Sequence, residues 1–152
     1  MIKEYEHYHG AFLRSVIVDA GQSISIKTDD SYGLINTYVL EDRISLFLKH
    51  STSRLAPWTF NFHSKHIQEL LDQAKKYETV FICLICGKDG VAVIPLNEFV
   101  SSIKATDGNQ IPIRVDRNKR SMYSVYGNAS VLEHKFSRGN KLILSAINSI
   151  SI

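Results

Sequence analysis

The sequence predicts an α/β fold, in which a mixed, twisted β-sheet is flanked by helices and followed by a small antiparallel annex. Two segments, 3–18 and 65–77, carry apolar residues at the spacing of an amphipathic helix. Between and after them lie short runs rich in β-branched and aromatic residues, which are typical of strands. The run 79–86 is apolar on both faces, as expected of a central strand covered on two sides. From residue 108 onward, short strand patterns alternate with turns, which predicts the annex.

Length and composition bound the class of protein. A chain of 152 residues that is 44% hydrophobic and 22% charged has the size of one domain, or of one core with a small annex. No apolar run approaches the ~18–20 residues needed to cross a bilayer. The N-terminus lacks the apolar stretch of a secretory signal, and two cysteines are too few for a disulfide framework. We therefore expect a cytoplasmic protein without a membrane partner.

The first 50 residues predict one helix and three strands. Tyr5, Tyr8, Phe12 and Val16 form one apolar stripe, and the helix is expected to end at Asp19-Ala20-Gly21. Polar turn residues separate the segments that follow. Strands are expected at residues 24–27, 34–40 and 44–49, the last two as an antiparallel hairpin.

A fourth strand and the second helix come next. The alternation over 57–62 places Trp58, Phe60 and Phe62 on one face, so these aromatic side chains are predicted core residues. Ser64 is the predicted N-cap of the helix.

A hairpin and a short helix follow. The turn Gly87-Lys88-Asp89-Gly90 is expected to join strands 79–86 and 91–96. It is too short for a P-loop and opens onto a strand, so we interpret it as a turn. Asn97 is expected to cap a short helix over 98–103.

The last third predicts a small antiparallel meander. Strands are expected at 111–115, 122–126 and 131–136. Residues 142–150 fit either a strand or a helix. The turn at 106–109 is the best candidate boundary, which divides the chain into a core at 1–105 and a basic, β-rich annex at 106–152 packed on it.

Charge is distributed unevenly along the chain. Residues 1–103 hold 10 Lys and Arg against 12 Asp and Glu, whereas residues 104–152 hold 8 against 3. The basic residues of the annex gather at two turns, 117–120 and 138–141. Such turns fit an ordinary solvated surface, and they equally fit a small basic face that binds phosphates.

The order helix, strand, strand, strand, helix, strand over residues 3–96, with a third strand that ends in Lys49, resembles the PD-(D/E)XK nuclease superfamily. It looks most like the Holliday-junction-resolvase branch, which has a restriction-endonuclease-like core. The resemblance covers about 60% of the chain and concerns its layout. It implies a nuclease-like α/β core that contacts DNA or RNA.

The catalytic positions of that family are only partly matched. The resemblance implies two carboxylates that hold Mg²⁺ and a lysine that stabilises charge beside it. Lys49 matches the lysine, but the acidic position of its triplet falls on Phe47 and the preceding aspartate falls on or near Asn36. A working nuclease would need relocated carboxylates, for which the candidates are Glu6, Asp29, Asp30 and Asp42.

Lys49 has two further interpretations. It could end and protect an exposed strand edge, or it could open a polar, cationic run, 49–54, that cradles an anion. Lys49, His50 and Arg54 would then form one anion-binding edge. The other edge would consist of the basic residues of the annex with one stacking aromatic, namely Arg117, Lys119, Arg120, Tyr123, Arg138 and Lys141.

Other patterns point to structure more than to chemistry. Cys83 and Cys86 lie three apart in a predicted strand and face opposite sides, so they cannot share a metal. His63 and His66 straddle the start of a helix without an evident third ligand. We expect no cofactor, with Mg²⁺ needed only if the chain is a nuclease.

Three functions stay open on the sequence. The leading one is a nuclease-like domain without catalytic activity that binds nucleic acid weakly or binds a protein partner. The second is a metal-dependent nuclease with relocated carboxylates. The third is an interaction protein that forms a homodimer through the strand edge near Trp58.

Overall fold

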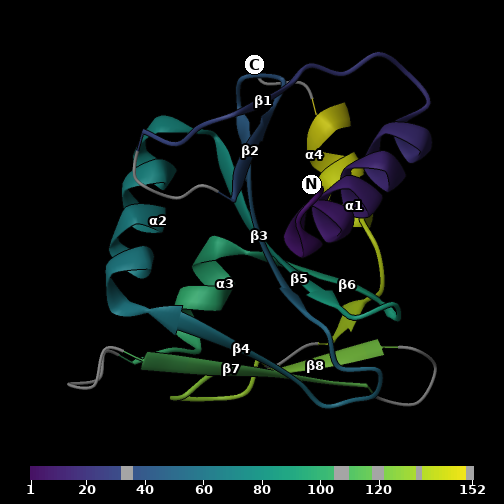
Figure 1. Ribbon diagram of the computed structural model, residues 1–152. Coiled ribbons are helices and arrows are strands. Elements are labelled where there is room, and N and C mark those ends of the chain that lie inside the picture. Colours follow the sequence, from purple (N-terminus) through teal and green to yellow (C-terminus); the bar gives the residue numbers. More distant parts are fainter. Residues whose placement is uncertain (32–35, 105–109, 118–121, 133–134, 150–152) are drawn as a thin grey trace.

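The computed structural model describes residues 1–31, 36–104, 110–117, 122–132 and 135–149, and it confirms the α/β fold (Figure 1). The elements in chain order are α1 (Glu4–Ala20), β1 (Ile26–Thr28), β2 (Thr37–Leu40), β3 (Ile44–Ser51), β4 (Trp58–His63), α2 (Ser64–Lys76), β5 (Thr79–Cys86), β6 (Gly90–Pro95), α3 (Leu96–Ser101), β7 (Gln110–Arg117), β8 (Met122–Tyr126), β9 (Phe136–Ser137) and α4 (Lys141–Asn148).

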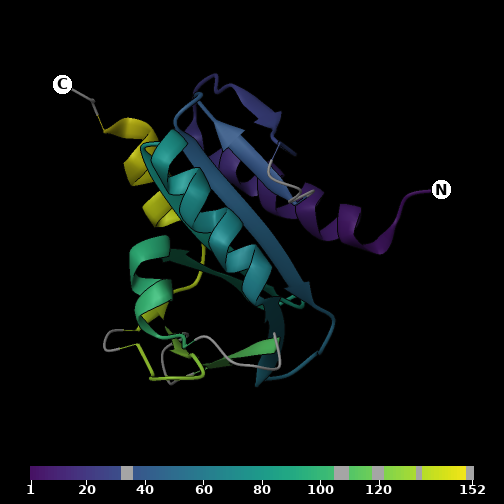
Figure 2. The ribbon, with the colours of Figure 1, turned by 90° about the vertical axis from the view of Figure 1, so that its left-hand side faces the viewer.

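The larger sheet is mixed and has the strand order β1-β2-β3-β5-β6. Strands β3 and β5 are parallel, with Ile44 opposite Thr79 and Ser51 opposite Cys86, and the other pairs are antiparallel. The parallel pair requires a crossover, which β4 and α2 supply. Helices α1 and α4 cover one face of this sheet, and α2 and α3 lie on the other (Figures 1 and 2).

The smaller sheet is antiparallel and has the order β4-β7-β8-β9. After β3 the chain leaves the larger sheet. Strand β4 then pairs with β7 along its whole length, from Trp58 opposite Val115 to His63 opposite Gln110. The smaller sheet crosses the end of the larger one, below α2 and α3 in Figure 1. Strand β4 thus joins the two parts of the chain, and the division into 1–105 and 106–152 stays a prediction.

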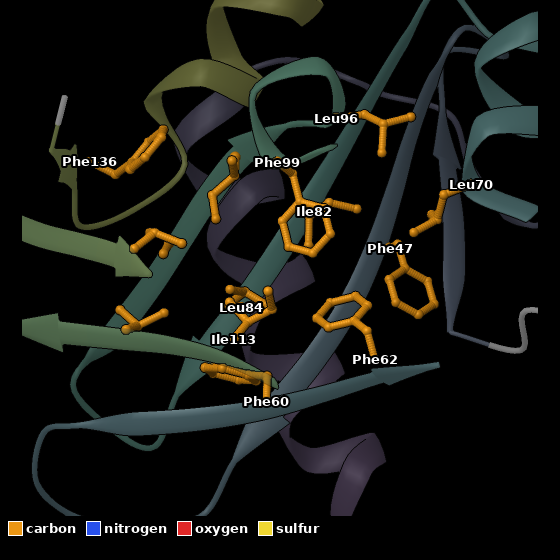
Figure 3. Close-up of a cluster of buried hydrophobic side chains, with 14 of the residues drawn as sticks. Phe47, Phe60, Phe62, Leu70, Ile82, Leu84, Leu96, Phe99, Ile113 and Phe136 are labelled. Atoms are coloured by element: carbon orange, nitrogen blue, oxygen red, sulfur yellow. The ribbon is translucent and has the colours of Figure 1, made fainter. Parts of the chain in front are cut away.

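Two apolar cores lie on the two faces of the larger sheet. Alternation along β3 sends Leu46 and Leu48 toward α1 and α4, and sends Phe47 toward α2 and the smaller sheet. Phe47, Phe62 and Phe99 meet in the core that lies between the larger sheet, helices α2 and α3, and the smaller sheet (Figure 3). The Phe62 and Phe99 ring centroids are 4.9 Å apart. The expected core role of Trp58, Phe60 and Phe62 is confirmed, because all three are buried.

Several boundaries differ from the sequence prediction. Residues 142–150, for which strand and helix were both open, contain helix α4. Helix α2 begins at Ser64, and its N-cap is His63, whose Nδ1 accepts the Lys65 amide at 3.1 Å; the prediction of Ser64 as N-cap was wrong. His63 can cap the helix because its backbone is still extended at the end of β4.

The remaining differences concern a helix start and two strands. Helix α3 starts at Leu96 after Pro95, so Asn97 does not cap it. In the predicted strand 131–136, Val131 makes only an isolated bridge to Tyr126, and β9 begins at Phe136. Within 34–40, residues 34–35 lie outside the described residues. None of the helices in the described ranges combines the length and apolar character needed to span a membrane.

Candidate anion-binding groove

Lys49 and His50, expected on one anion-binding edge, face opposite sides of the larger sheet because they are successive residues of β3. The Lys49 ammonium donates to the backbone oxygen of Asn61 at 2.6 Å and lies 5.0 Å from the centre of the Phe62 ring. Burial lowers the pKa of Lys49. Lys49 therefore links β3 to the edge strand β4 of the smaller sheet. Its own strand lies between β2 and β5, so Lys49 does not protect an exposed edge of β3.

His50 lies under α1. Its ring stacks on Tyr8 with 4.5 Å between centroids and 16° between planes, and its Nε2 is 3.6 Å from a carboxylate oxygen of Glu4. His50 is thus held by two residues of the first turns of α1.

The positions where the resemblance implies metal-binding acids contribute none. Phe47 is 2% exposed, and its ring packs 6.0 Å from that of Phe62 in the core. Asn36 offers its backbone oxygen to the amide of Leu48. Within the described ranges, no three His, Cys, Asp or Glu side chains are grouped as metal ligands.

The candidate relocated carboxylates are held elsewhere or exposed. Asp29 accepts hydrogen bonds from Ser31 and from Tyr77 and Lys76 at the end of α2. Against the raising effect of burial, these bonds hold the pKa of its carboxyl far below the usual range. Asp42 pairs with Lys27 at 2.8 Å at the turn before β3, the end opposite Lys49. Glu6 accepts the Lys3 amide in the first turn of α1, and Asp30 is exposed.

A polar groove of about 310 Å³ lies where the loop after β3 meets the β5–β6 turn. Its lining combines hydroxyl, cationic and aromatic side chains with one glycine and one carboxylate, from Tyr8, Thr52, Ser53, Arg54, Gly87, Lys88 and Asp89. Within the described part of the chain, the side chains of Arg54 and Lys88 make no hydrogen bond or ion pair, and both residues are exposed. These are the groups that an anion would contact.

A backbone hydrogen bond joins the two walls of this groove, because the Gly87 amide donates to the backbone oxygen of Ser51 at 2.9 Å. The Trp58 indole holds the loop after β3 by donating to the backbone oxygen of Ser53 at 2.9 Å. Gly87 has a φ of +55°, and a Cβ at this position would lie 2.4 Å from the Ser53 oxygen. Only glycine fits this close approach in a left-handed conformation without strain.

Asp89 joins the groove to the smaller sheet. Its carboxylate accepts a hydrogen bond from Arg117 at 2.8 Å, from the Tyr123 hydroxyl at 2.6 Å and from Arg138 at 3.4 Å. Burial, with this hydrogen bond to Asp89, raises the pKa of Tyr123. Tyr123 and Arg138 lie 34 and 49 residues after Asp89 in the chain, and both contact it at this turn.

The charge at this end of the molecule is positive. Arg54 and Lys88 line the groove, and Arg117 and Arg138 stand at its edge. Among the described residues that line the groove, Asp89 is the one carboxylate. Asp116 lies next to Arg117 and accepts its backbone amide.

The structure brings together Arg54, Arg117, Arg138 and Tyr123 from the two expected edges. It places Lys141 apart, on α4, where it lines a different shallow groove with Leu144 and Asn148. Lys119 and Arg120 lie outside the described residues. Tyr123 is buried, so it supports Asp89 and cannot stack on a ligand.

A second, mostly apolar groove of about 550 Å³ adjoins the polar one. It runs between α1 and the β5–β6 hairpin, and its apolar lining includes Tyr8, Ala11, Phe12, Ile85 and Val91. The two grooves share three lining residues, namely Tyr8, Gly87 and Lys88.

Sequence reasoning missed Tyr8, Lys88 and Asp89 as residues of this site. Tyr8 belongs to an apolar helix stripe, and nothing in that stripe distinguishes it. Lys88 and Asp89 did carry a signal, because a charged pair at a hairpin turn next to basic turns could have been grouped with them.

The other residues that the sequence singles out have structural roles. Cys83 and Cys86 are buried in the two different cores, as expected from their spacing. Trp58 is 1% exposed and packs edge-on against Tyr123 with 5.9 Å between centroids, so its ring is not available at the surface. Strand β4 is nevertheless an edge strand of its sheet, and a homodimer stays a prediction.

No protein-family model, curated protein or solved structure matches this chain. The resemblance to the nuclease superfamily therefore stays a prediction from the order of elements.

Proposed function

We propose that this chain is a nuclease-like domain without catalytic activity that binds nucleic acid weakly through the polar groove and its basic surroundings. The observation that carries the proposal is the pair Arg54 and Lys88, two exposed cations without a side-chain partner in the described ranges, on the walls of one preformed groove. Phosphate contacts from such residues are the main sequence-independent source of affinity for nucleic acid.

The surroundings of the groove support a polymeric anion. Arg117 and Arg138 share Asp89, which leaves this end of the molecule with more positive than negative charge. Thr52 lies beside the cations, and its hydroxyl can donate a hydrogen bond to a phosphate oxygen, whereas the Ser53 hydroxyl donates to the Leu55 backbone oxygen at 2.9 Å. A small cluster of this kind contacts few phosphates, so the affinity is expected to be weak and to depend on salt.

The core supports the absence of catalysis in this proposal. Phe47 occupies the position where the resemblance implies a metal-binding acid, and Lys49 bonds an internal backbone oxygen. A nuclease of the implied type needs a carboxylate pair for Mg²⁺ beside the lysine.

The test is a fluorescence anisotropy titration with labelled duplex, single-stranded and four-way-junction DNA and the matching RNA, at low and moderate salt, with and without Mn²⁺. Each sample is then run on a denaturing gel. We expect salt-sensitive binding and intact probes. Absence of binding at low salt would overturn the proposal in favour of a protein-interaction domain, and cut probe would overturn the assignment as non-catalytic.

A further inference from the structure

The polar and apolar grooves adjoin each other through shared lining residues and form two chemically different halves of one surface. One half is lined by Thr52, Ser53 and Arg54, and the other by apolar side chains of α1, β5 and β6. Tyr8 and Lys88 line both halves, so they stand at the point where the two meet. A nucleotide has the same division, because a charged phosphate is joined to a flat, largely apolar base.

We propose that the joined groove takes one nucleotide of a single strand, with its phosphate beside Arg54 and Lys88 and its base in the apolar half against Tyr8. This inference rests on the proposed function and makes it more specific, because it names single-stranded nucleic acid as the ligand.

The lining favours a base as the occupant of the apolar half, and the volume is large enough to admit one. A volume of about 550 Å³ falls within the range of small-ligand sites in proteins. Phe12, Ile85 and Val91 provide an apolar wall, and Tyr8 provides an aromatic ring next to the cations. An aromatic platform beside cations is the usual arrangement for binding single strands without sequence preference.

Tyr8 is held in place before any ligand binds. Its ring lies flat against that of His50, which also contacts Glu4. Glu4 lines the apolar half as well, and its negative charge disfavours a phosphate there. The charges thus orient the nucleotide, with the phosphate at the end formed by Arg54 and Lys88.

A duplex cannot use the apolar half in this way. Its bases are paired and stacked inside the helix, and one of them reaches a protein pocket only after unstacking. A single strand presents its bases without that penalty, so we expect single strands to bind more tightly than duplexes of equal length.

The experiment compares two labelled probes with the same number of phosphates, a ten-nucleotide oligothymidylate and its abasic analogue, by fluorescence anisotropy. The wild-type chain is expected to bind the thymidylate about tenfold more tightly. Tyr8→Leu keeps apolar bulk but removes the ring, and it should abolish most of this difference. Tyr126→Leu is the matched control, because Tyr126 is a half-buried tyrosine of the smaller sheet that stacks on Arg114.

A second readout does not depend on a variant. The methyl NMR signals of Val91 and Ile85 should shift with the thymidylate and stay in place with the abasic probe. Equal affinity for both probes would overturn this inference and leave the proposed function standing. No binding of either probe would overturn both.

Discussion

Position 47 is occupied by a phenylalanine that serves the core. The proposed resemblance to the nuclease superfamily would place a metal-binding acid there. The Phe47 ring packs against Phe62, and the side chain is nearly fully buried. A carboxylate in the same apolar surroundings would carry a large desolvation cost. The apolar core around Phe47 therefore disfavours a metal-binding acid at this position.

Gly87 is the residue on which the geometry of the polar groove depends most. Gly87→Ala should destabilise the fold by about 1–3 kcal/mol from backbone strain alone, because its φ is positive. It should also weaken nucleic-acid binding, since the turn can no longer lie against Ser53. Urea unfolding measures the first effect and anisotropy the second.

Gly10→Ala is the control for that prediction. Gly10 lies within α1, and a Cβ there would meet nothing within 4 Å, so this change should stabilise the fold by about 0.5–1 kcal/mol. A stability for Gly87→Ala equal to that of the wild type would contradict the described packing of the turn.

Lys49 provides a test that separates a structural from a catalytic lysine. Lys49→Met should leave nucleic-acid affinity within about twofold of wild type, because Lys49 lines neither groove and bonds Asn61. Asn61 belongs to β4 and lies opposite Pro112 of β7, so the hydrogen bond from Lys49 joins β3 to the smaller sheet. A large loss of affinity, or loss of a Mn²⁺-dependent cleavage activity, would assign Lys49 to a functional site.

At the scale of elements, local sequence patterns are sufficient to predict most strands of the larger sheet. The apolar run that became β5, the turn after it and the amphipathic spacing of α2 are all local signals. The sheet to which β4 belongs could not be predicted from the sequence. Alternation indicates which face of a strand is buried, but it does not identify the strand with which it pairs. Segment 142–150 was ambiguous for a similar reason, since short apolar runs fit a strand or a helix.

Gln73 illustrates an interaction that periodicity does not reveal. This residue of α2 is fully buried, accepts a hydrogen bond from Ser45 at 2.7 Å and donates to Thr37 at 3.4 Å. Gln73→Leu should cost about 1–3 kcal/mol, because it leaves two buried hydroxyl groups without this partner. Urea unfolding followed by Trp58 fluorescence would measure this cost.

The control for Gln73→Leu is a variant in which the hydroxyl groups that bond Gln73 are removed as well. Adding Ser45→Ala and Thr37→Val to Gln73→Leu should recover much of the lost stability, because no polar group of the network then remains buried. A triple variant no more stable than the single one would show that the hydrogen bonds are not the cause.

At the scale of the whole molecule, the basic surroundings of the groove depend on the contact between the two sheets. Asp89 belongs to a turn of the larger sheet, whereas Tyr123 and Arg117 belong to the smaller one. The basic turns and Arg54 are visible in the sequence, which predicts them on separate edges. Contacts over tens of residues decide which of these cations share a surface, and composition contains no information about such contacts.

The most direct test of the proposed function is the salt dependence of binding to a labelled single strand, compared for two variants that each remove two positive charges. Arg54→Ala/Lys88→Ala removes the cations of the groove. Lys65→Ala/Lys75→Ala removes two exposed lysines of α2, on the opposite face of the larger sheet.

Each phosphate contact contributes about 0.7 to the slope of log affinity against log salt for a single strand. The groove variant is expected to lower the steepness of this slope by about 1.4, whereas the α2 variant is expected to leave the slope near that of the wild type. Equal slopes for the two variants would show that net charge alone governs binding, and they would contradict the assignment of the groove.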